Sequence, residues 1–270
     1  MRSQMSSNQP LILLTNDDGF DSQGISALFH RLKDWAQTYI VAPAQEKSAS
    51  SLSLTLHHPL RVKSVQKNIY AVDGTPADCV YLAVQKLLPR YPDLLISGLN
   101  HGPNLGQQDI SYSGTVAGAL QGAFLSIPSL AVSVLADKKG KYFFDYAAQI
   151  VHALAKKLVE NSLPARIALN INIPGPPIKG VRLSSLGEKR YNPRVIEKTD
   201  PRGRRYYWIG TGNPQDIGDN NSDVMIAKRG YIAVTPLQKD LTDSAFARSK
   251  TLNTLLASLQ DEILQAKTEK

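Results

Sequence analysis

The chain has very little cysteine and no long apolar segment, and both features narrow its class. Cys79 is the single cysteine in 270 residues, so an intramolecular disulfide is excluded and the residue is assigned to the core. Thiolate metal sites need several cysteines, so any metal here should be held by oxygen ligands. No stretch approaches the roughly 20 apolar residues of a membrane span. We therefore expect a protein that does not interact with membranes.

The first residues also lack an apolar run. Met1–Pro10 is polar, and the first apolar run, Leu11–Leu14, is too short for the middle region of a secretory signal. We expect a polar extension over residues 1–10 and a cytoplasmic protein.

Acidic residues are outnumbered, with 31 Lys and Arg against 23 Asp and Glu, a net charge of +8 and a pI near 9.4. Such a surface attracts anions, including phosphates and nucleic acids. Much of the excess lies between Lys189 and Arg205. We interpret this segment as a solvated arm rather than a nucleic-acid site, so nucleic acid is not an expected partner.

Short apolar runs alternate with longer amphipathic stretches, as strands and crossover helices do in a parallel sheet. The predicted strands are 11–14, 39–42, 94–96, 129–134 and 167–173. The predicted helices are 22–35, 78–88, 115–125, 144–159 and 251–264. Pro174–Pro177 breaks the pattern, so we expect the run 167–173 to close the sheet. The predicted fold class is α/β, a Rossmann-like three-layer fold with a mostly parallel sheet.

The segment Gly180–Gly212 is basic and rich in aromatic residues, and Asp200–Gly203 joins two extended runs as a tight turn would. We predict a projecting β-hairpin. Its aromatic run Tyr206–Trp208 indicates either a subunit contact or packing back onto the parent domain. The predicted organisation is an α/β core with the active site over 11–179, and a hairpin arm with a C-terminal helical tail for oligomerisation over 180–270.

Polar segments follow three predicted strands, at the sheet edge where open α/β sheets bind ligands. They are Thr15–Phe20, Pro43–Ser48 and Ser97–Gly106. Adjacent carboxylates at Asp17 and Asp18 repel each other and lose hydration, so a nearby cation would be needed to keep both ionised. Mg²⁺ and Mn²⁺ prefer carboxylate, amide and hydroxyl oxygens. The residues that supply this set are Asp17, Asp18, Ser48 and Asn100.

The local sequence leaves a simpler alternative open for this first turn. Asp17–Gly19 is equally consistent with an ordinary strand-to-helix turn that carries an Asp cap. A dinucleotide site is disfavoured, because Gly19 stands alone where such a site needs G-x-G-x-x-G.

The stretch Ser97–Thr115 is rich in glycine and ends at a predicted helix start. Its backbone N–H groups, with the Ser113–Thr115 hydroxyls, are suited to wrap a phosphate at a helix N-terminus. The alternative is a flexible loop in which Ser113 or Thr115 is an ordinary N-cap. We assign His101 to hydrogen bonding rather than to catalysis.

Five ordered motifs resemble the SurE survival-protein nucleotidases. They are Thr15–Gly19, Ser48 with Ser51–Thr55, Gly74–Val80, Ser97–Gly106 and Tyr112–Val116. The similarity continues through Gly230–Leu237 and Asp240–Thr242, so it covers nearly the whole chain.

The resemblance implies a phosphomonoesterase that needs one divalent cation per subunit, Mg²⁺ or Mn²⁺, and that hydrolyses nucleoside 5′- and 3′-monophosphates, with polyphosphate as a further substrate of some members. It maps the metal ligands onto Asp17, Asp18, Ser48 and Asn100. It also implies phosphate contacts from Asn104, Ser113, Gly114 and Thr115, and homodimers or homotetramers that exchange the hairpin and tail.

For the chemistry, we expect a metal-held phosphate to be attacked in line by water. Either Asp17 or Asp18 would serve as general base or acid, and we favour Asp18. A phosphoaspartyl intermediate is an alternative. The rival function is a nucleotide-binding or nucleic-acid-binding protein without turnover.

Overall fold

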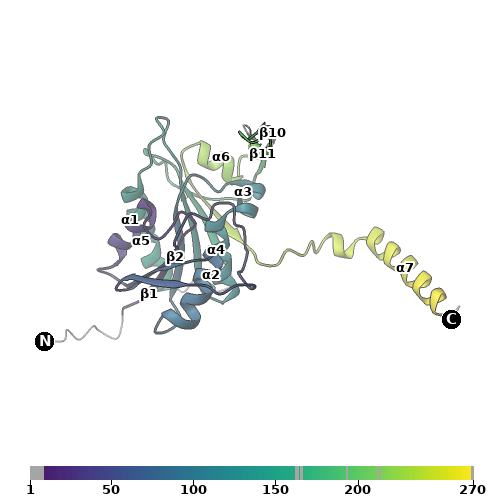
Figure 1. Cartoon of the computed structure of the whole chain (residues 1–270), viewed down its shortest axis with the longest axis horizontal. Helices are drawn as coiled ribbons and strands as arrows, with labels where there is room; N and C mark the ends of the chain where they lie inside the picture. Colours follow the sequence, from purple (N-terminus) through teal and green to yellow (C-terminus); the bar gives the residue numbers. More distant parts are fainter. Residues whose placement is uncertain are drawn as a thin grey trace. The chain divides into compact units, whose positions relative to one another are not determined.

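The computed structural model describes residues 9–161, 164, 167–192, 194–210, 212 and 214–268. The chain divides into two compact units, residues 1–237 and 238–270. Within its described residues, the first unit is built on a nine-stranded sheet in the order β3-β4-β2-β1-β5-β6-β7-β13-β8. Helices cover both faces of this mostly parallel sheet, which confirms the predicted α/β class (Figure 1).

Six neighbouring strands form the parallel part of the sheet. In spatial order they are β4 (Ile69–Val72), β2 (Gln37–Pro43), β1 (Leu11–Thr15), β5 (Leu94–His101), β6 (Ser129–Val134) and β7 (Ala168–Ile173). At one end, β3 (Val62–Gln66) pairs antiparallel with β4.

The sheet continues beyond β7, so the expectation that the run 167–173 closes it is wrong. β13 (Ile232–Leu237) pairs antiparallel with β7, and β8 (Val181–Leu183) pairs parallel with β13. Both strands come after the Pro174–Pro177 break. A proline-rich segment ends one strand, but it does not prevent later strands from returning to the same sheet.

Alternation along the strands builds two cores. Ile12 and Leu14 of β1 pack toward α1 (Gln23–Leu32) and α5 (Phe144–Asn161). Leu11 and Leu13 belong to the core on the opposite face. That face is covered by α2 (Pro76–Leu82), its π-helical continuation η1 (Ala83–Leu87), and α4 (Gly114–Phe124). Because side chains alternate between faces, a strand covered on both sides is apolar throughout. Cys79 lies in the second core, as predicted.

Strands β1 and β5 are neighbours although more than 80 residues separate their register partners, such as Ile12 and Leu94. β1 pairs with β2 on its other side, so the strand order reverses between β1 and β5. Ligands bind at such a switch point, outside the carboxyl ends of the strands. The turn after β1 and the end of β5 therefore form one edge.

Strand β5 is longer than predicted and extends to His101. Its register against β6 shifts between Ser97 and Asn100, which marks a bulge. Gly98 occupies this bulge with φ of 134°, and a Cβ there would lie 2.3 Å from the carbonyl oxygen of Val132. Gly98 lies just beyond the predicted strand 94–96, and it permits a kink within the longer strand that is observed.

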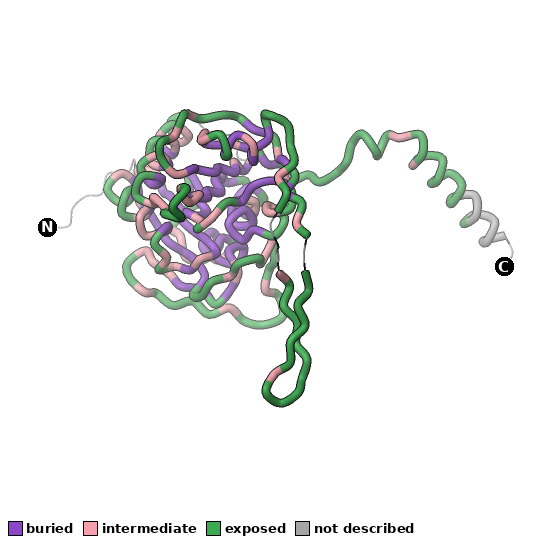
Figure 2. The backbone as a smooth tube through the Cα atoms, turned by 90° about the horizontal axis from the view of Figure 1, so that it is seen from above, coloured by how far each residue is buried: buried purple, intermediate pink, exposed green. Residues whose placement is uncertain are grey.

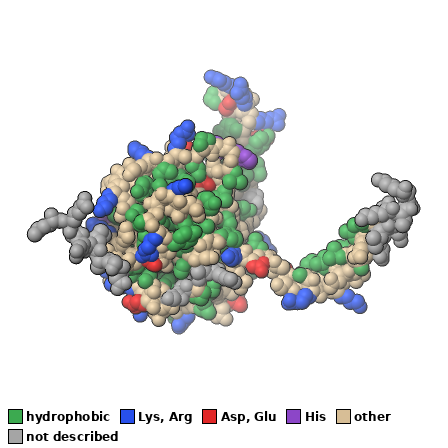
Figure 3. Space-filling model, turned by 90° about the horizontal axis from the view of Figure 1, so that it is seen from below, with side chains coloured by type: hydrophobic (Ala, Val, Ile, Leu, Met, Phe, Trp, Pro, Cys, Tyr) green, Lys and Arg blue, Asp and Glu red, His purple; other side chains and the backbone are tan. Residues whose placement is uncertain are grey.

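The basic segment forms the predicted hairpin from β10 (Arg194–Thr199) and β11 (Arg205–Gly210). It projects from the first unit and is exposed along both strands (Figure 2). Along the described residues of both strands, the hairpin does not pack back onto the parent domain. Basic side chains gather on this projection in Figure 3. At its base, β9 (Glu188–Arg190) pairs with β12 (Gln215–Ile217).

Two short helices were not predicted, α3 (Gly106–Tyr112) and α6 (Asp223–Lys228). α3 lies inside the stretch that we expected to be a loop; its few residues carry no apolar periodicity. The second unit contains the 3₁₀ helix η2 (Phe246–Arg248) and α7 (Lys250–Thr268), which confirms the predicted C-terminal helix. Among the described helices, none combines the length and apolarity needed to cross a membrane.

Candidate metal and phosphate site

Three loops meet at the carboxyl edge of the sheet around the turn that follows β1. The Lys47 N–H donates to the carbonyl oxygen of Asp17 at 2.7 Å, which attaches the loop after β2. The His101 N–H donates to Oδ2 of Asp18 at 3.2 Å, which attaches the end of β5. The predicted convergence of these three polar segments is therefore observed.

Asp17 is buried, with 6% of its surface exposed, against the first turn of α4. The Thr115 hydroxyl donates to Oδ1 of Asp17. A Cβ on Gly114 would lie 2.7 Å from Cβ and 2.8 Å from Oδ2 of Asp17, so only glycine allows this approach. Burial raises the pKa of Asp17, and the hydrogen bond from Thr115 acts in the opposite direction. A helix N-terminus also favours a negative charge beside it.

Asp18 is only partly buried, and the carboxylates of Asp17 and Glu46 both act on it. Burial, and after it the charge of Asp17, raise the pKa of Asp18 to about 6. The carboxylate of Glu46 adds to this rise, whereas the N–H of His101 opposes it. A cation between the two aspartates would relieve the repulsion that raises this pKa.

Asn100 and Ser48 stand on the two loops that flank the aspartates. The Asn100 side-chain amide donates to the carbonyl oxygen of Gly102 at 2.9 Å, which fixes its orientation at the end of β5. Ser48 is exposed, and its hydroxyl donates to Oε1 of Glu46 at 2.6 Å. The structure therefore brings Asp17, Asp18 and Asn100 to one edge, while the Ser48 hydroxyl is turned toward Glu46.

Asn104 lies at the centre of a buried polar network. Its side-chain amide donates to Oγ of Ser133 at 2.8 Å. Its backbone carbonyl accepts hydrogen bonds from the side chains of Asn170 and Asn172, both at 2.9 Å, and its N–H donates to Asn172 at 3.0 Å. These bonds hold the loop after β5 against β6 and β7. The predicted phosphate contact of Asn104 stays a prediction.

Ser113 caps the helix that carries Gly114 and Thr115. Its hydroxyl accepts from the N–H of Val116 at 3.1 Å, so the N-cap role considered for this residue is present. The cap does not occupy the remaining N–H groups of the first turn, which are the groups that a phosphate contacts at a helix start.

Sequence reasoning missed Ser50. Its Oγ is buried and, within the described part of the chain, has no hydrogen-bond partner. A Cβ on Gly114 would lie 2.8 Å from this oxygen and 2.8 Å from Oδ2 of Asp17. Buried hydroxyls are normally paired, so an unpaired one beside a carboxylate indicates a place for a ligand atom. The serine-rich stretch after Ser48 was its only sequence signal.

Sequence reasoning assigned no role to Asp223, which is fully buried at the start of α6. Its carboxylate accepts from the N–H groups of Gly106 at 2.9 Å and Gly187 at 2.8 Å. It thereby ties the loop after Asn104 to the segment that leads into the hairpin. No local pattern predicts a bond across 117 positions of sequence.

The donor set at this edge suits a hard divalent cation. Within the described residues, no group of three or more His, Cys, Asp and Glu side chains is placed to hold a metal. Two carboxylates, an amide and hydroxyls remain, and oxygen donors of this kind bind Mg²⁺ and Mn²⁺. The raised pKa of Asp18 and the buried Ser50 oxygen, which has no partner among the described residues, both fit the binding of a cation or a phosphate at this place.

The fold and site together define a Rossmann-like α/β protein with paired carboxylates and a helix N-terminus at its switch point. The family model described as "Survival protein SurE" matches residues 12–193. The chain belongs to the SurE family.

Individual SurE proteins match this chain over most of its length. The chain is 44% identical to the 5′-nucleotidase SurE of Syntrophotalea carbinolica over 233 residues, which cover 86% of this chain and 93% of the relative. It is also 44% identical to the 5′-nucleotidase SurE of Vibrio cholerae serotype O1 over 243 residues, 88% of this chain and 95% of the relative. The crystal structure of the SurE protein from Aquifex aeolicus matches with a TM-score of 0.77 and 38% identity, covering 91% of this chain and 99% of that one.

Proposed function

We propose that this protein is a divalent-metal-dependent 5′-nucleotidase, a phosphomonoesterase that hydrolyses nucleoside monophosphates to nucleoside and phosphate. The relatives named 5′-nucleotidase SurE support the activity. The observation that carries the proposal at this site is the pair Asp17 and Asp18 at the switch point, with the first turn of α4 directly against Asp17. Such an edge suits a cation and a phosphate together.

Asp17, Asp18, Asn100 and Ser48 would hold the metal, with the Ser48 hydroxyl released from Glu46. The bound cation would supply Lewis-acid polarisation of the phosphate. Mg²⁺ and Mn²⁺ both suit the oxygen donors.

The remaining phosphate oxygens would be held by the start of α4, over Ser113, Gly114 and Thr115, and by the loop at Asn104. Fixed N–H donors aimed at the transferring phosphoryl group stabilise the charge of its transition state. The Ser50 hydroxyl, buried beside Gly114, is a further donor for this position.

Asp18 is the favoured general acid or base. It is less buried than Asp17, and its pKa of about 6 lies close to neutral pH, which suits proton transfer. Asp17 is held by Thr115 and is better placed as a fixed ligand. Direct attack by water and a phosphoaspartyl intermediate both suit this arrangement.

We also propose that residues 180–270 serve assembly into a homodimer or homotetramer, and that the site belongs to residues 11–179. Exposed apolar side chains on the hairpin, including Trp208 at 62% and Ile209 at 78% exposure, support the first part. The assignment of the site to residues 11–179 is supported by Asp17, Asn100 and Thr115, which all lie in this range. A cytoplasmic location stays a prediction.

The test is phosphate release from a panel of 5′- and 3′-nucleoside monophosphates, with Mn²⁺, with Mg²⁺ and with EDTA. Asp17→Asn and Asn100→Ala should lose activity, while the matched control Asp34→Asn, at an exposed turn after α1, should keep it. If folded wild type releases no phosphate with either metal, the activity is wrong. Retained nucleotide affinity in the presence of EDTA would then favour a binding protein without turnover.

A further inference from the structure

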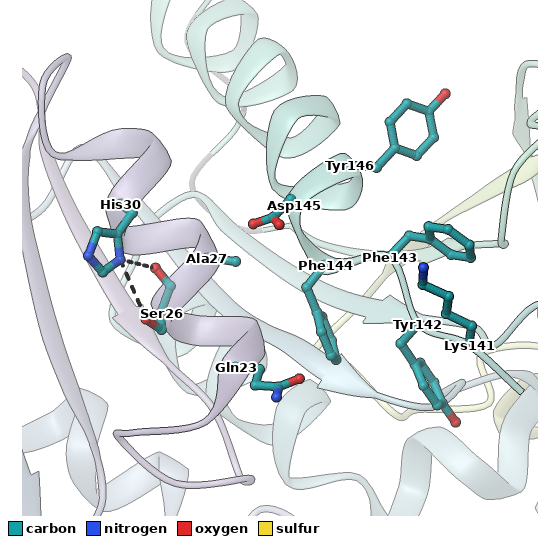
Figure 4. A pocket seen from close by; sticks show the side chains of 10 residues that line it. All are labelled: Gln23, Ser26, Ala27, His30, Lys141, Tyr142, Phe143, Phe144, Asp145 and Tyr146. Carbon is teal, nitrogen blue, oxygen red and sulfur yellow. Dashed lines mark hydrogen bonds between the residues drawn. The ribbon is translucent and has the colours of Figure 1, made fainter.

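A cavity of about 610 Å³ opens between the first turns of α1 and the segment that leads into α5 (Figure 4). Gln23 and Ser26 line it from α1, and Tyr142, Phe144 and Asp145 line it from the other side. The volume lies within the range of small-molecule sites. Nothing in the metal and phosphate site described above uses it.

An aromatic contact connects this cavity to the paired carboxylates. His101, whose N–H is bonded to Asp18, places its ring 3.8 Å from the ring of Tyr142, measured between centroids. The rings of Tyr142 and Phe144 are almost parallel, at 10°, with centroids 6.0 Å apart. The cavity wall thus begins one side chain away from the residue that contacts Asp18.

Both cavity rings have the flat faces that a planar ligand needs. Tyr142 and Phe144 pack partly against the core below them, and both remain partly exposed where they line the cavity. An aromatic side chain that is already packed against its neighbours loses little freedom when a planar group stacks on it.

The polar groups around the rings can recognise the edges of such a ligand. Gln23 offers both an amide donor and an amide acceptor, and it extends from α1 toward the side on which Phe144 lies (Figure 4). Lys141 adds a donor and Asp145 an acceptor at the cavity. Donors and acceptors around a stacking surface match a nucleobase better than a purely apolar group.

We propose that this cavity is the nucleobase subsite of the enzyme, in which Tyr142 and Phe144 stack on the base while the phosphate lies at Asp17 and Asp18. The inference rests on the proposed nucleotidase function and extends it to the part of the substrate that is recognised. It makes Tyr142 a substrate-binding residue and Gln23 a residue that contacts the edge of the base.

Two substrates separate base binding from phosphate chemistry: adenosine 5′-monophosphate, and p-nitrophenyl phosphate, which carries no nucleobase. We expect Tyr142→Ala to lower kcat/KM for the nucleotide roughly 10-fold or more, chiefly through KM. The kcat/KM for p-nitrophenyl phosphate should stay within about twofold of wild type. Tyr142→Phe keeps the ring and should restore kcat/KM for the nucleotide. Tyr81→Ala, which removes an exposed tyrosine of α2, is the matched control.

Equal losses on both substrates would overturn the proposal, because Tyr142 would then act on Asp18 through His101. An unchanged nucleotide kcat/KM would overturn it as well. If Tyr142→Ala does not fold, Gln23→Ala decides, since it should alter the relative kcat/KM for the four common nucleoside 5′-monophosphates and unaltered ratios would contradict the subsite. Wild type that hydrolyses p-nitrophenyl phosphate but no nucleotide would instead refute the proposed function.

Discussion

The backbone N–H of His101 donates a 3.2 Å hydrogen bond to Oδ2 of Asp18, and this bond joins the carboxyl ends of two strands across the switch point. Asp18 follows β1, and His101 is the last residue of β5. The bond uses only the backbone of His101, so its imidazole ring is left to pack against Tyr142. One residue therefore connects the carboxylate pair with the neighbouring cavity.

Ionisation of Asp18 should weaken the metal-free protein. Its pKa is raised from 3.8 to about 6, so the folded state holds the proton more tightly than the unfolded chain does. The resulting stability is fully present below pH 3.8 and is lost as the pH rises through about 6. With EDTA present, we expect the free energy of unfolding in urea to fall by about 0.5–1 kcal/mol between pH 5 and pH 7, a range discounted for the partial exposure of Asp18.

Asp18→Asn is the control for this dependence, because its side chain does not titrate and the fall should become smaller. Mn²⁺ should stabilise wild type more at pH 7 than at pH 5, since cation and proton compete for the same carboxylates. Identical pH profiles for wild type and Asp18→Asn would contradict the assignment.

Thr115→Val should damage both the fold and the activity. The substitution keeps the shape of the side chain but removes the hydroxyl that donates to Asp17, which leaves a buried carboxylate with one partner fewer. We expect a loss of about 1–3 kcal/mol in the free energy of unfolding at pH 7. Thr115→Ser keeps the hydroxyl and should recover most of the phosphate release. Equal effects of the two substitutions would exclude the hydroxyl as the cause.

Gly114→Ala should abolish activity while the protein stays largely folded. The added methyl group would lie within 2.8 Å of Oδ2 of Asp17 and of Oγ of Ser50, so it would push both side chains away from the phosphate position. Overpacking of this kind costs about 1–3 kcal/mol of stability. Gly210→Ala in the hairpin is the control, because its nearest contact, at 3.4 Å, is an ordinary one. A Gly114→Ala enzyme with normal kcat would show that α4 does not contact the phosphate.

Asp223→Asn should loosen the loop after Asn104. One carboxylate receives the N–H groups of Gly106 and Gly187, and an asparagine would turn an NH₂ group toward one of these donors. Leaving a buried N–H donor without its partner costs about 1–3 kcal/mol. Urea unfolding with tryptophan fluorescence measures the loss, and the exposed Asp219→Asn serves as control. A change in the free energy of unfolding below about 0.5 kcal/mol, as is typical of surface substitutions, would contradict the role given to Asp223.

Shortening the hairpin should change the size of the assembly. Replacing residues 195–209 by a two-residue turn removes exposed apolar side chains, among them Val195, Trp208 and Ile209. We expect a smaller oligomer by light scattering after size-exclusion chromatography, with phosphate release retained. Trp208→Ala should give a partial shift in the same direction. An unchanged mass would leave the arm without its proposed role in assembly.

The regular elements could be predicted because each has a strong local signal. The apolar run of β1 and the amphipathic spacing of α1 lie within one or two turns of sequence, and both were placed to within a few residues. β13 was missed because it pairs with β7, a strand about 60 positions earlier in the sequence. α3 was missed because it is too short to show the apolar spacing of a helix. Asn170 and Asn172 lie in a buried strand, where amide side chains need hydrogen-bond partners. This need could have predicted a polar contact such as the one they make with the loop at Asn104.

The sequence by itself determined the α/β class, the position of each polar turn after its strand, and the paired carboxylates of Asp17 and Asp18. These follow from periodicity and from residue chemistry, which act over a few neighbouring positions. Only the tertiary structure decided that Gly114 and Thr115 approach Asp17, that the Ser50 hydroxyl is buried beside Gly114, and that Tyr142 reaches His101. Contacts between distant segments depend on how the helices and loops pack over the sheet, and packing is set by the whole chain at once.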